Sequence, residues 1–175
     1  MTAIPDKLKG FMCYEGLNSR IMVGVADITL PVLTFMSDTL QGPGIAGEVD
    51  VPATGIFSSL TATVNWHSLV DGNIRFAAPR TYFLDFQGSL ELYDHARGEF
   101  REQQIRVAMK ANPKSVTLGT FNVAAKMGTA AEFELIYLNI SIDGNEHIEL
   151  DKFAYIFRVN GHDFLRVTRR NMGLA

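Results

Sequence analysis

The sequence predicts a mainly β protein, a barrel or sandwich with one short α-helix and a long glycine-rich arm. Two turn signals near the end of the chain support this, Asp143-Gly144 and Asn160-Gly161, each flanked by β-branched and aromatic residues. Such pairs favour hairpins because both central positions of a type I′ turn need a positive φ. Apolar and polar residues also alternate over several segments upstream, which is typical of strands with one buried face.

The two turn signals predict strands at 133–142, 147–159 and 164–174. In the first of these, alternate apolar residues share one face: Ile136, Leu138, Ile140 and Ile142. In the second, the apolar residues change parity after Asp151, from that of Leu150 to that of Phe153, Tyr155 and Phe157. Because side chains alternate between the two faces of a strand, this change predicts a bulge, a bend or a change of packing partner at 151–153.

Upstream, the most regular alternation runs over 58–66. Its apolar residues predict a buried face: Leu60, Ala62, Val64 and Trp66. Small polar residues occupy the other face: Ser59, Thr61, Thr63 and Asn65. We expect further strands at 20–30, 82–93, 103–109 and 115–127, with turns at 96–98 and 112–113. Pro31 should end the first of these, and Ile105, Val107 and Met109 should face inward. Helical signals are confined to 67–78, so about eight or nine strands and one short helix are expected.

Length, composition and charge exclude several classes of protein. The 175 residues, 47% of them hydrophobic, are enough to bury one core, and no linker divides them, so residues 1–175 are expected to form a single domain. No signal peptide and no run of about 20 apolar residues is visible, which predicts a soluble protein made in a cytoplasm. A net charge of -3 argues against a nucleic-acid binder. The single cysteine, Cys13, excludes a disulfide within the chain.

A glycine-rich segment at about 32–57 differs from the rest of the chain because it is long and weakly periodic. Connections of this length are uncommon inside compact domains and are often functional. We expect either a lid or an arm that becomes ordered against a partner. The alternative is a disordered surface loop.

None of the familiar catalytic or ligand-binding patterns fits the sequence. The stretch Gly42–Gly47 matches G-x-G-x-x-G, but it does not join a strand to a helix, and Pro43 removes one amide donor. The four histidines lack metal-ligand spacing: His67, His95, His147 and His162. Alternating charge on the solvent face of a strand explains Glu146, Glu149 and Asp151. We therefore predict no catalytic residue, no metal site and no cofactor.

Two regions of the chain together resemble a known family. One runs from Ile28 to Gly55 and includes the glycine-rich arm. The other spans 140–174 and combines an Asp-Gly-x-Glu hairpin, a Val-Asn-Gly turn and the ending Arg-Arg-Asn-Met-Gly-Leu. In this order they resemble the major tail tube proteins of contractile-tailed bacteriophages, which also occur in phage-tail-like bacteriocin particles. The resemblance covers about the first third and the last quarter of the chain.

The resemblance implies hexameric rings that stack into a hollow tube inside a contractile sheath. It implies a virion component assembled in the cytoplasm of a bacterial host, with sheath, tape-measure, baseplate and terminator proteins as partners. DNA would be at most a non-specific passing cargo, and no membrane binding or enzyme activity is implied. Each subunit would lend about four strands to a shared inner barrel that surrounds an aqueous channel.

Within that architecture, the arm is the expected bridge between stacked rings, with Leu40, Ile45 and Val49 as its apolar anchors. The basic end of the chain is expected to meet acidic groups on neighbouring subunits through Arg166, Arg169 and Arg170. The polar row on 58–66 either lines part of the lumen or faces ordinary solvent. Two alternatives remain open: a single-chain β-barrel that binds a small molecule or catalyses a reaction, and a ring protein of type VI secretion.

Overall fold

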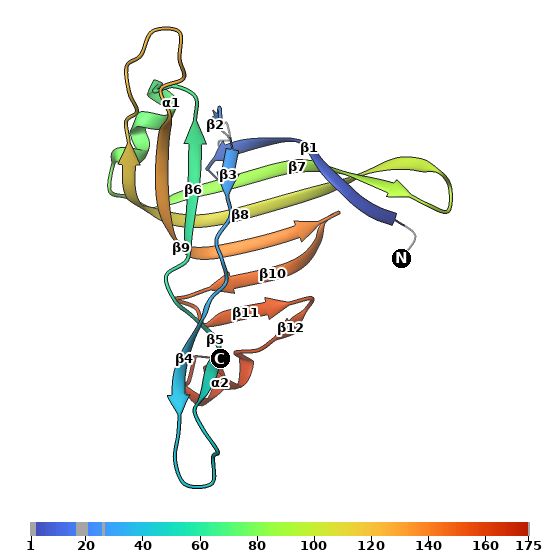
Figure 1. Ribbon diagram of the computed structural model, residues 1–175, viewed down its shortest axis with the longest axis vertical. Helices are drawn as coiled ribbons and strands as arrows, with labels where there is room; N and C mark the ends of the chain where they lie inside the picture. The colour runs from blue at the N-terminus through green and yellow to red at the C-terminus, as the bar shows by residue number, and fades with distance from the viewer. Residues whose placement is uncertain (1–2, 17–20, 26, 175) are drawn as a thin grey trace.

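The computed structural model describes residues 3–16, 21–25 and 27–174, and most of them lie in strands (Figure 1). The first strands are β1 (Ala3–Glu15), β2 (Ile21–Val23), β3 (Asp27–Thr29), β4 (Phe35–Leu40), β5 (Val49–Phe57) and β6 (Thr61–Trp66). After two short helical turns, α1 (Asp71–Ile74) and η1 (Arg75–Ala77), come β7 (Tyr82–Asp94), β8 (Glu99–Thr117) and β9 (Thr129–Ile142). The chain ends with β10 (Asn145–Asp151), β11 (Ile156–Val159), β12 (His162–Asp163) and α2 (Arg166–Asn171).

Ten of these strands form one sheet, in the order β12-β11-β10-β9-β8-β7-β1-β2, with β6 paired to β9 and β3 paired to β6. The first half of β9 pairs with β6 and the second half with β10. The sheet therefore folds over itself into a sandwich-like arrangement. It does not close into a barrel within the described residues, so the sandwich form of the prediction is the correct one.

The fold depends on bends in the two long strands. The β8–β9 register shifts at Lys110/Ala111 and again at Pro113/Ser115. The first shift explains why the buried residues of β9 change parity, with Phe133 and Leu135 buried before it and Leu138 after it. The second shift corrects the turn expected at 112–113: β8 runs through this point, and a bulge accommodates a proline because it leaves one residue out of the ladder.

An aromatic core fills the space between the two layers. Trp66 of β6 stacks on Phe76 of η1, with ring centroids 5.6 Å apart. Phe76 also meets Tyr82 and Phe133 edge to face at 4.9 and 5.5 Å. The predicted buried face of β6 is confirmed, since Leu60, Ala62, Val64 and Trp66 are all buried, and so is the short helical segment within 67–78.

Both hairpin turns are confirmed. Asp143 and Gly144 have φ of 49° and 78°, and Asn160 and Gly161 have φ of 49° and 81°. These are the positive values that a type I′ turn requires.

The strand expected at 147–159 is two strands, because the chain reverses direction between β10 and β11. The Asp151 carboxylate accepts hydrogen bonds from the backbone N–H groups of Phe153 and Ala154, at 2.9 and 2.8 Å, and so stabilises the turn. The change of parity therefore marks a reversal rather than a bulge. Phe157 is buried as its parity predicts, whereas Phe153 lies on the turn with 79% of its surface exposed.

The single strand expected at 20–30 is two short strands, β2 and β3, which pair with β1 and β6. Two further predicted strands are wrong. Residues 118–128 form a projecting loop instead of continuing the strand expected at 115–127. The strand expected at 164–174 is the helix α2. The helix ends at Asn171. Gly173 follows with a φ of 74°, and the N–H of Leu174 donates to the carbonyl of Arg169 at 2.9 Å. A glycine after two arginines is a typical C-terminal helix signal, which the hairpin pattern masked.

Candidate assembly surfaces

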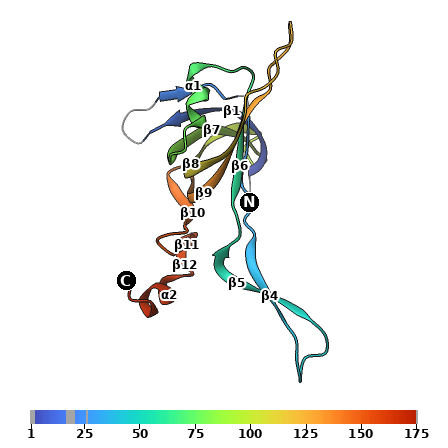
Figure 2. The same cartoon turned by 90° about the vertical axis from the view of Figure 1, so that its left-hand side faces the viewer.

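The glycine-rich arm is an ordered hairpin of β4 and β5, which project away from the large sheet as a separate ribbon (Figure 2). The ribbon pairs Leu40 with Val49 and Ser37 with Pro52. Leu40 and Val49 are about half exposed, at 54% and 51%, and Ile45 at the tip is half-buried. All three predicted anchors thus lie on the projecting part of the arm.

The arm has an acidic surface. Its charged residues are Asp38, Glu48 and Asp50, and residues 32–57 contain no Lys, Arg or His. Asp50 accepts a hydrogen bond from the Thr39 hydroxyl at 2.9 Å, across the ribbon. A partner of the arm should therefore offer apolar and basic groups.

Aromatic rings attach the arm to the body of the protein. Phe35 and Phe57 stack at 4.8 Å, and both meet Phe157 of β11 edge to face, at 5.9 and 4.9 Å. Phe164, just before α2, lies 5.5 Å from Phe157. We call these four rings the arm root. It joins the two regions that carry the family resemblance, which are far apart in the sequence.

Gly55 of β5 makes the closest contact between the arm and the C-terminal region. Its φ is 76°, and a Cβ at this position would lie 2.8 Å from Cγ of Leu165. Only glycine avoids both the backbone strain and the collision. The small residue therefore lets β5 lie directly against the residue that begins α2.

The three C-terminal arginines have different surroundings. Arg169 donates to the backbone carbonyl of Tyr155 at 2.7 Å and forms an ion pair with Asp163. The hydrogen bond from Arg169 lowers the pKa of the Asp163 carboxyl. Arg166 and Arg170 are exposed on α2. Arg169 is engaged within its own subunit. We therefore keep only Arg166 and Arg170 as predicted contacts with a neighbouring subunit.

The polar row on 58–66 lies on the side of β6 that faces away from the core. Ser59 donates to Glu134, and Asn65 Nδ2 donates to Asp27 at 2.5 Å. Thr61 and Thr63 are half-buried between β3 and β9. The row is thus part of a hydrogen-bonded outer surface of the sandwich.

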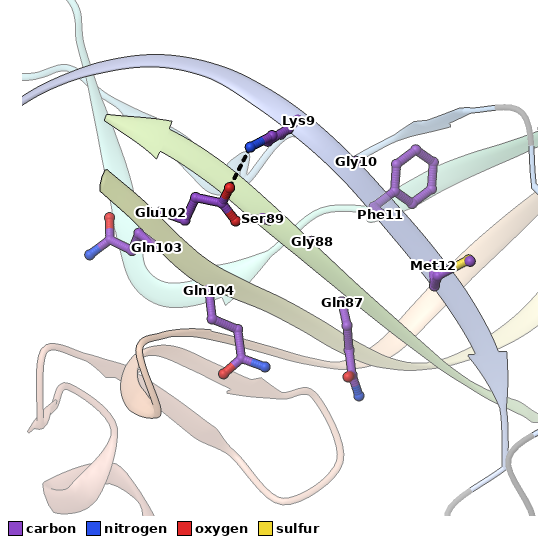
Figure 3. Close-up of a pocket in the computed structure, with 10 residues that line it drawn as sticks. All are labelled: Lys9, Gly10, Phe11, Met12, Gln87, Gly88, Ser89, Glu102, Gln103 and Gln104. Atoms are coloured by element: carbon purple, nitrogen blue, oxygen red, sulfur yellow. Dashed lines mark hydrogen bonds and ion pairs between the residues drawn. The ribbon is translucent and has the colours of Figure 1, made fainter. Parts of the chain in front are cut away.

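A larger polar face, which the sequence analysis missed, lies on the other side of the core, along β1, β7 and β8. Its centre is an open hollow of about 690 Å³ (Figure 3). Residues from all three strands line it: Lys9, Gly10, Phe11, Met12, Gln87, Gly88, Ser89, Glu102, Gln103 and Gln104. The alternation of Gln87 and Ser89 with the apolar residues of β7 could have revealed this face.

Three cations on this polar face pair with carboxylates. Lys9 of β1 reaches across β7 to Glu102 of β8 (Figure 3), and Lys7 meets Glu91 at 3.3 Å. Arg106 binds the buried Asp85 through two nitrogens, at 2.7 and 3.1 Å. The hydrogen bond to Asp85 raises the pKa of Arg106, and the one to Glu102 raises the pKa of Lys9. The face is therefore polar without presenting these positive charges freely.

One free edge of the sheet is the outer side of β1. This strand pairs with β7 over most of its length but with β2 only through residues 13–15. No other described strand pairs with residues 3–12 on that side. Beside it lies an apolar hollow of about 310 Å³, whose lining includes Leu8, Ile28 and Leu90. An open edge next to an apolar hollow is a surface that invites another chain.

Two carboxylates that the sequence analysis examined as possible catalytic groups have structural roles. Glu149 forms an ion pair with Arg158 at 2.5 Å, and Glu146 accepts from Asn139 at 2.6 Å. In the described ranges, no three His, Cys, Asp or Glu side chains gather where a metal ion would fit. None of the helices there is both long and apolar enough to cross a membrane.

Comparison with known proteins identifies the family of this chain. A family model described as phage tail tube protein FII matches residues 5–173. A tail tube protein of Escherichia phage P2 is 29% identical over 177 residues, covering 98% of this chain and 99% of the relative.

Two chains from cryo-EM structures of an extracellular contractile injection system, PVC, match this chain at low TM-scores. The one from the sheath/tube terminator has a TM-score of 0.45 at 12% identity and covers 79% of this chain and 96% of its own. The one from the sheath-tube complex has a TM-score of 0.44 at 13% identity and covers 75% and 86%. The family assignment rests on the two sequence matches. By these matches, the chain belongs to the phage tail tube protein FII family.

Proposed function

We propose that this structural tail tube subunit forms hexameric rings, which stack into a hollow conduit, and that it catalyses no reaction. The open edge of β1 carries the proposal. In a ring, the free edge of one subunit would pair with the far end of the sheet of the next, so that no edge remains exposed. The apolar hollow beside β1 would be covered by the same contact.

The polar face of β1, β7 and β8 would line the lumen. Six subunits with about four strands each would give about 24 strands, and a backbone diameter on the order of 50 Å. Such a channel is filled with water, so its lining must be polar. The hollow around Gln87 and Gln104 has that character.

Paired charges on this face suit the passage of DNA. Lysine and arginine side chains that contact phosphates hold DNA through counterion release. Here Lys7, Lys9 and Arg106 already have carboxylate partners. A genome would therefore slide past with little electrostatic friction.

On this model, the row of Ser59, Thr61, Thr63 and Asn65 lies outside the lumen, because it occupies the opposite side of the core. The outer surface would be available to a sheath protein, while terminator, tape-measure and baseplate proteins would meet the ends and the interior of the tube. The tube would belong to the virion or to a phage-like particle and be assembled in the host cytoplasm. A type VI ring would share these surfaces, whereas the single-chain barrel does not match a sheet that stays open.

Thiol labelling of assembled tubes tests which polar face lines the lumen. Burial raises the pKa of the Cys13 thiol to about 12, so this cysteine should react little with maleimides at neutral pH. In tubes, Gln87→Cys should react with a small maleimide but not with one linked to a polymer too large to enter the channel. Thr63→Cys and the exposed Asp71→Cys should react with both reagents.

Each outcome of the labelling bears on a different part of the proposal. If the polymer-linked maleimide labelled Gln87→Cys but not Thr63→Cys, the row on 58–66 would line the lumen and the face of β1, β7 and β8 would lie outside. Absence of rings and tubes from concentrated wild-type protein, examined by electron microscopy, would contradict the assembly itself.

A further inference from the structure

An apolar loop projects from the end of the molecule opposite the arm. Residues 118–128, here called the knob, connect β8 to β9, and the knob and the arm lie at the two ends of the longest axis (Figure 1). Phe121 and Val123 are 92% and 95% exposed. Such large apolar side chains in full contact with water at a protruding site indicate a contact surface.

Backbone hydrogen bonds, one within the knob and one to His67, hold the base of the knob in place. The N–H of Thr120 donates to the carbonyl of Met127 at 2.9 Å, and the N–H of Met127 donates to the carbonyl of His67 at 2.8 Å. Gly119 has a φ of 89°, and a Cβ there would lie 2.5 Å from the carbonyl oxygen of Met127. The two ends of the loop are thus held close together, and they fix the position from which the apolar tip projects.

The arm offers a complementary surface. A hollow of about 340 Å³ on the ribbon is lined by Asp38, Thr39, Leu40, Val51, Pro52 and Ala53. Leu40 and Val51 give this hollow an apolar lining, and it lies on an arm with three acidic residues and no basic one. The knob has the opposite charge, because Lys126 is its only charged residue.

We propose that the knob of one subunit docks on the arm of a second copy of the same chain in the adjacent ring. Phe121 and Val123 would fill the hollow beside Leu40 and Val51, and Lys126 would approach the acidic side chains of the arm. Two different surfaces at opposite ends of one molecule make a heterologous contact, which does not close and so extends a tube ring by ring. The inference rests on the proposed tube and names the partner of its arm.

Substitution of the knob tip tests the contact. Phe121→Asp/Val123→Asp should raise the critical concentration for tube growth by at least roughly tenfold. The variant replaces two apolar side chains that the contact would bury with charges that would face an acidic surface. Rings should still form. The control is Phe153→Asp, at another highly exposed phenylalanine, on the β10–β11 turn, which should polymerise like the wild type.

Mixing two defective variants tests the pairing directly. The arm variant Leu40→Asp/Val51→Asp keeps its knob, and the knob variant keeps its arm. Each alone should stop at single rings, while the mixture should give discrete two-ring complexes in sedimentation and by negative-stain electron microscopy. Lys126→Glu should weaken growth, and Glu48→Lys in the same chain should restore part of it.

The outcomes separate this inference from the proposed function. If wild-type protein forms tubes and the knob variant does too, the knob is not an inter-ring contact and the tube proposal stands. If the mixture yields no two-ring complex although both variants form rings, the pairing of knob with arm is wrong. If wild-type protein forms neither rings nor tubes, the proposed function itself fails.

Discussion

Gly55 shows how one residue couples the arm to the C-terminal helix. Its positive φ and its contact with Leu165 leave no room for a side chain. The chain therefore has a glycine where two regions that are distant in the sequence meet. A substitution here acts on the position of the arm and not on the arm strands themselves.

We expect Gly55→Ala to lower the free energy of unfolding by about 1–3 kcal/mol, through both backbone strain and overpacking. Urea denaturation measures the change. Gly144→Ala is the matched control, because Gly144 has a nearly equal φ of 78° but no atom within 4 Å of a Cβ. It should cost less, since it adds only the backbone strain. Equal costs for the two variants would mean that the contact with Leu165 contributes nothing.

A second prediction at this scale concerns Asp163, whose pKa is lowered chiefly by the hydrogen bond from Arg169. A carboxyl with a folded pKa below its unfolded value stabilises the protein fully above the unfolded value, about 3.9, and loses this contribution as the pH falls through the folded value. Asp163→Asn should therefore cost about 1–3 kcal/mol at pH 7 and progressively less below pH 4.

Urea denaturation at several pH values measures this difference between wild type and variant. Glu48→Gln, on the exposed arm, should change the unfolding free energy little at any pH. A cost of Asp163→Asn that stays constant down to pH 2 would exclude the ion pair with Arg169 as its source.

Among the elements, the arm depends most on its surroundings. A two-stranded ribbon alone is marginally stable in water. Here the ribbon is attached by the stacked rings of Phe35 and Phe57 and by their contacts with Phe157. The exposed part beyond this root contributes little to the core, so it is free to bind another chain.

We expect deletion of residues 37–47 to leave a folded protein that does not polymerise. The deletion removes the projecting ribbon but keeps Phe35 and Phe57, so circular dichroism and the unfolding midpoint should stay near those of the wild type. Electron microscopy should show rings without tubes. Tubes of normal length from this variant would contradict the bridging role of the arm.

At the scale of the whole molecule, the sandwich has two polar faces with different chemistry. The outer row on β6 is hydrogen-bonded to Glu134 and Asp27. The face of β1, β7 and β8 carries ion pairs across three strands. In a tube whose lumen is lined by the second face, its charges would determine how strongly DNA binds to the channel wall.

Removing Glu91 and Glu102, which pair with Lys7 and Lys9, should make the tube retain DNA. In Glu91→Gln/Glu102→Gln, the Lys9 ammonium loses both of its carboxylate partners and becomes available to phosphates, while Lys7 keeps only the neighbouring Asp6. Tubes of this variant should retain a fluorescent duplex oligonucleotide at low salt and release it as salt rises, because retention depends on counterion release. Wild-type tubes should not retain it.

The control for this prediction adds Lys7→Gln and Lys9→Gln to the same variant, which should abolish retention. If the double carboxylate variant releases DNA as freely as the wild type, these lysines do not face the channel.

How far the sequence predicts this protein depends on the range of the interactions. The hairpin at Asp143-Gly144, the buried face of β6 and the short helical segment after Trp66 follow from local rules, and the structure confirms them. The inward-facing Val107 and Met109 follow in the same way. The arm was visible as a glycine-rich segment, although its ribbon of strands was not.

Local patterns failed where distant contacts override them. Alternation within β7 shows only one row of the polar face, whose full extent depends on the pairing of β7 with β1 and β8. The reversal at 152–155 depends on the Asp151 carboxylate and on the pairing of β10 with β11, and the bulges of β8 depend on the partner strand.

The sequence by itself determined the β class, the principal turns and the family, because turn chemistry and alternation are local and the motif order is read directly. Only the tertiary structure decided that the base of the arm packs against Phe157 and Leu165, that Arg169 is engaged internally, and that the knob lies opposite the arm. These features depend on where a long strand bends and which strand it meets, and neither is encoded by a neighbouring residue.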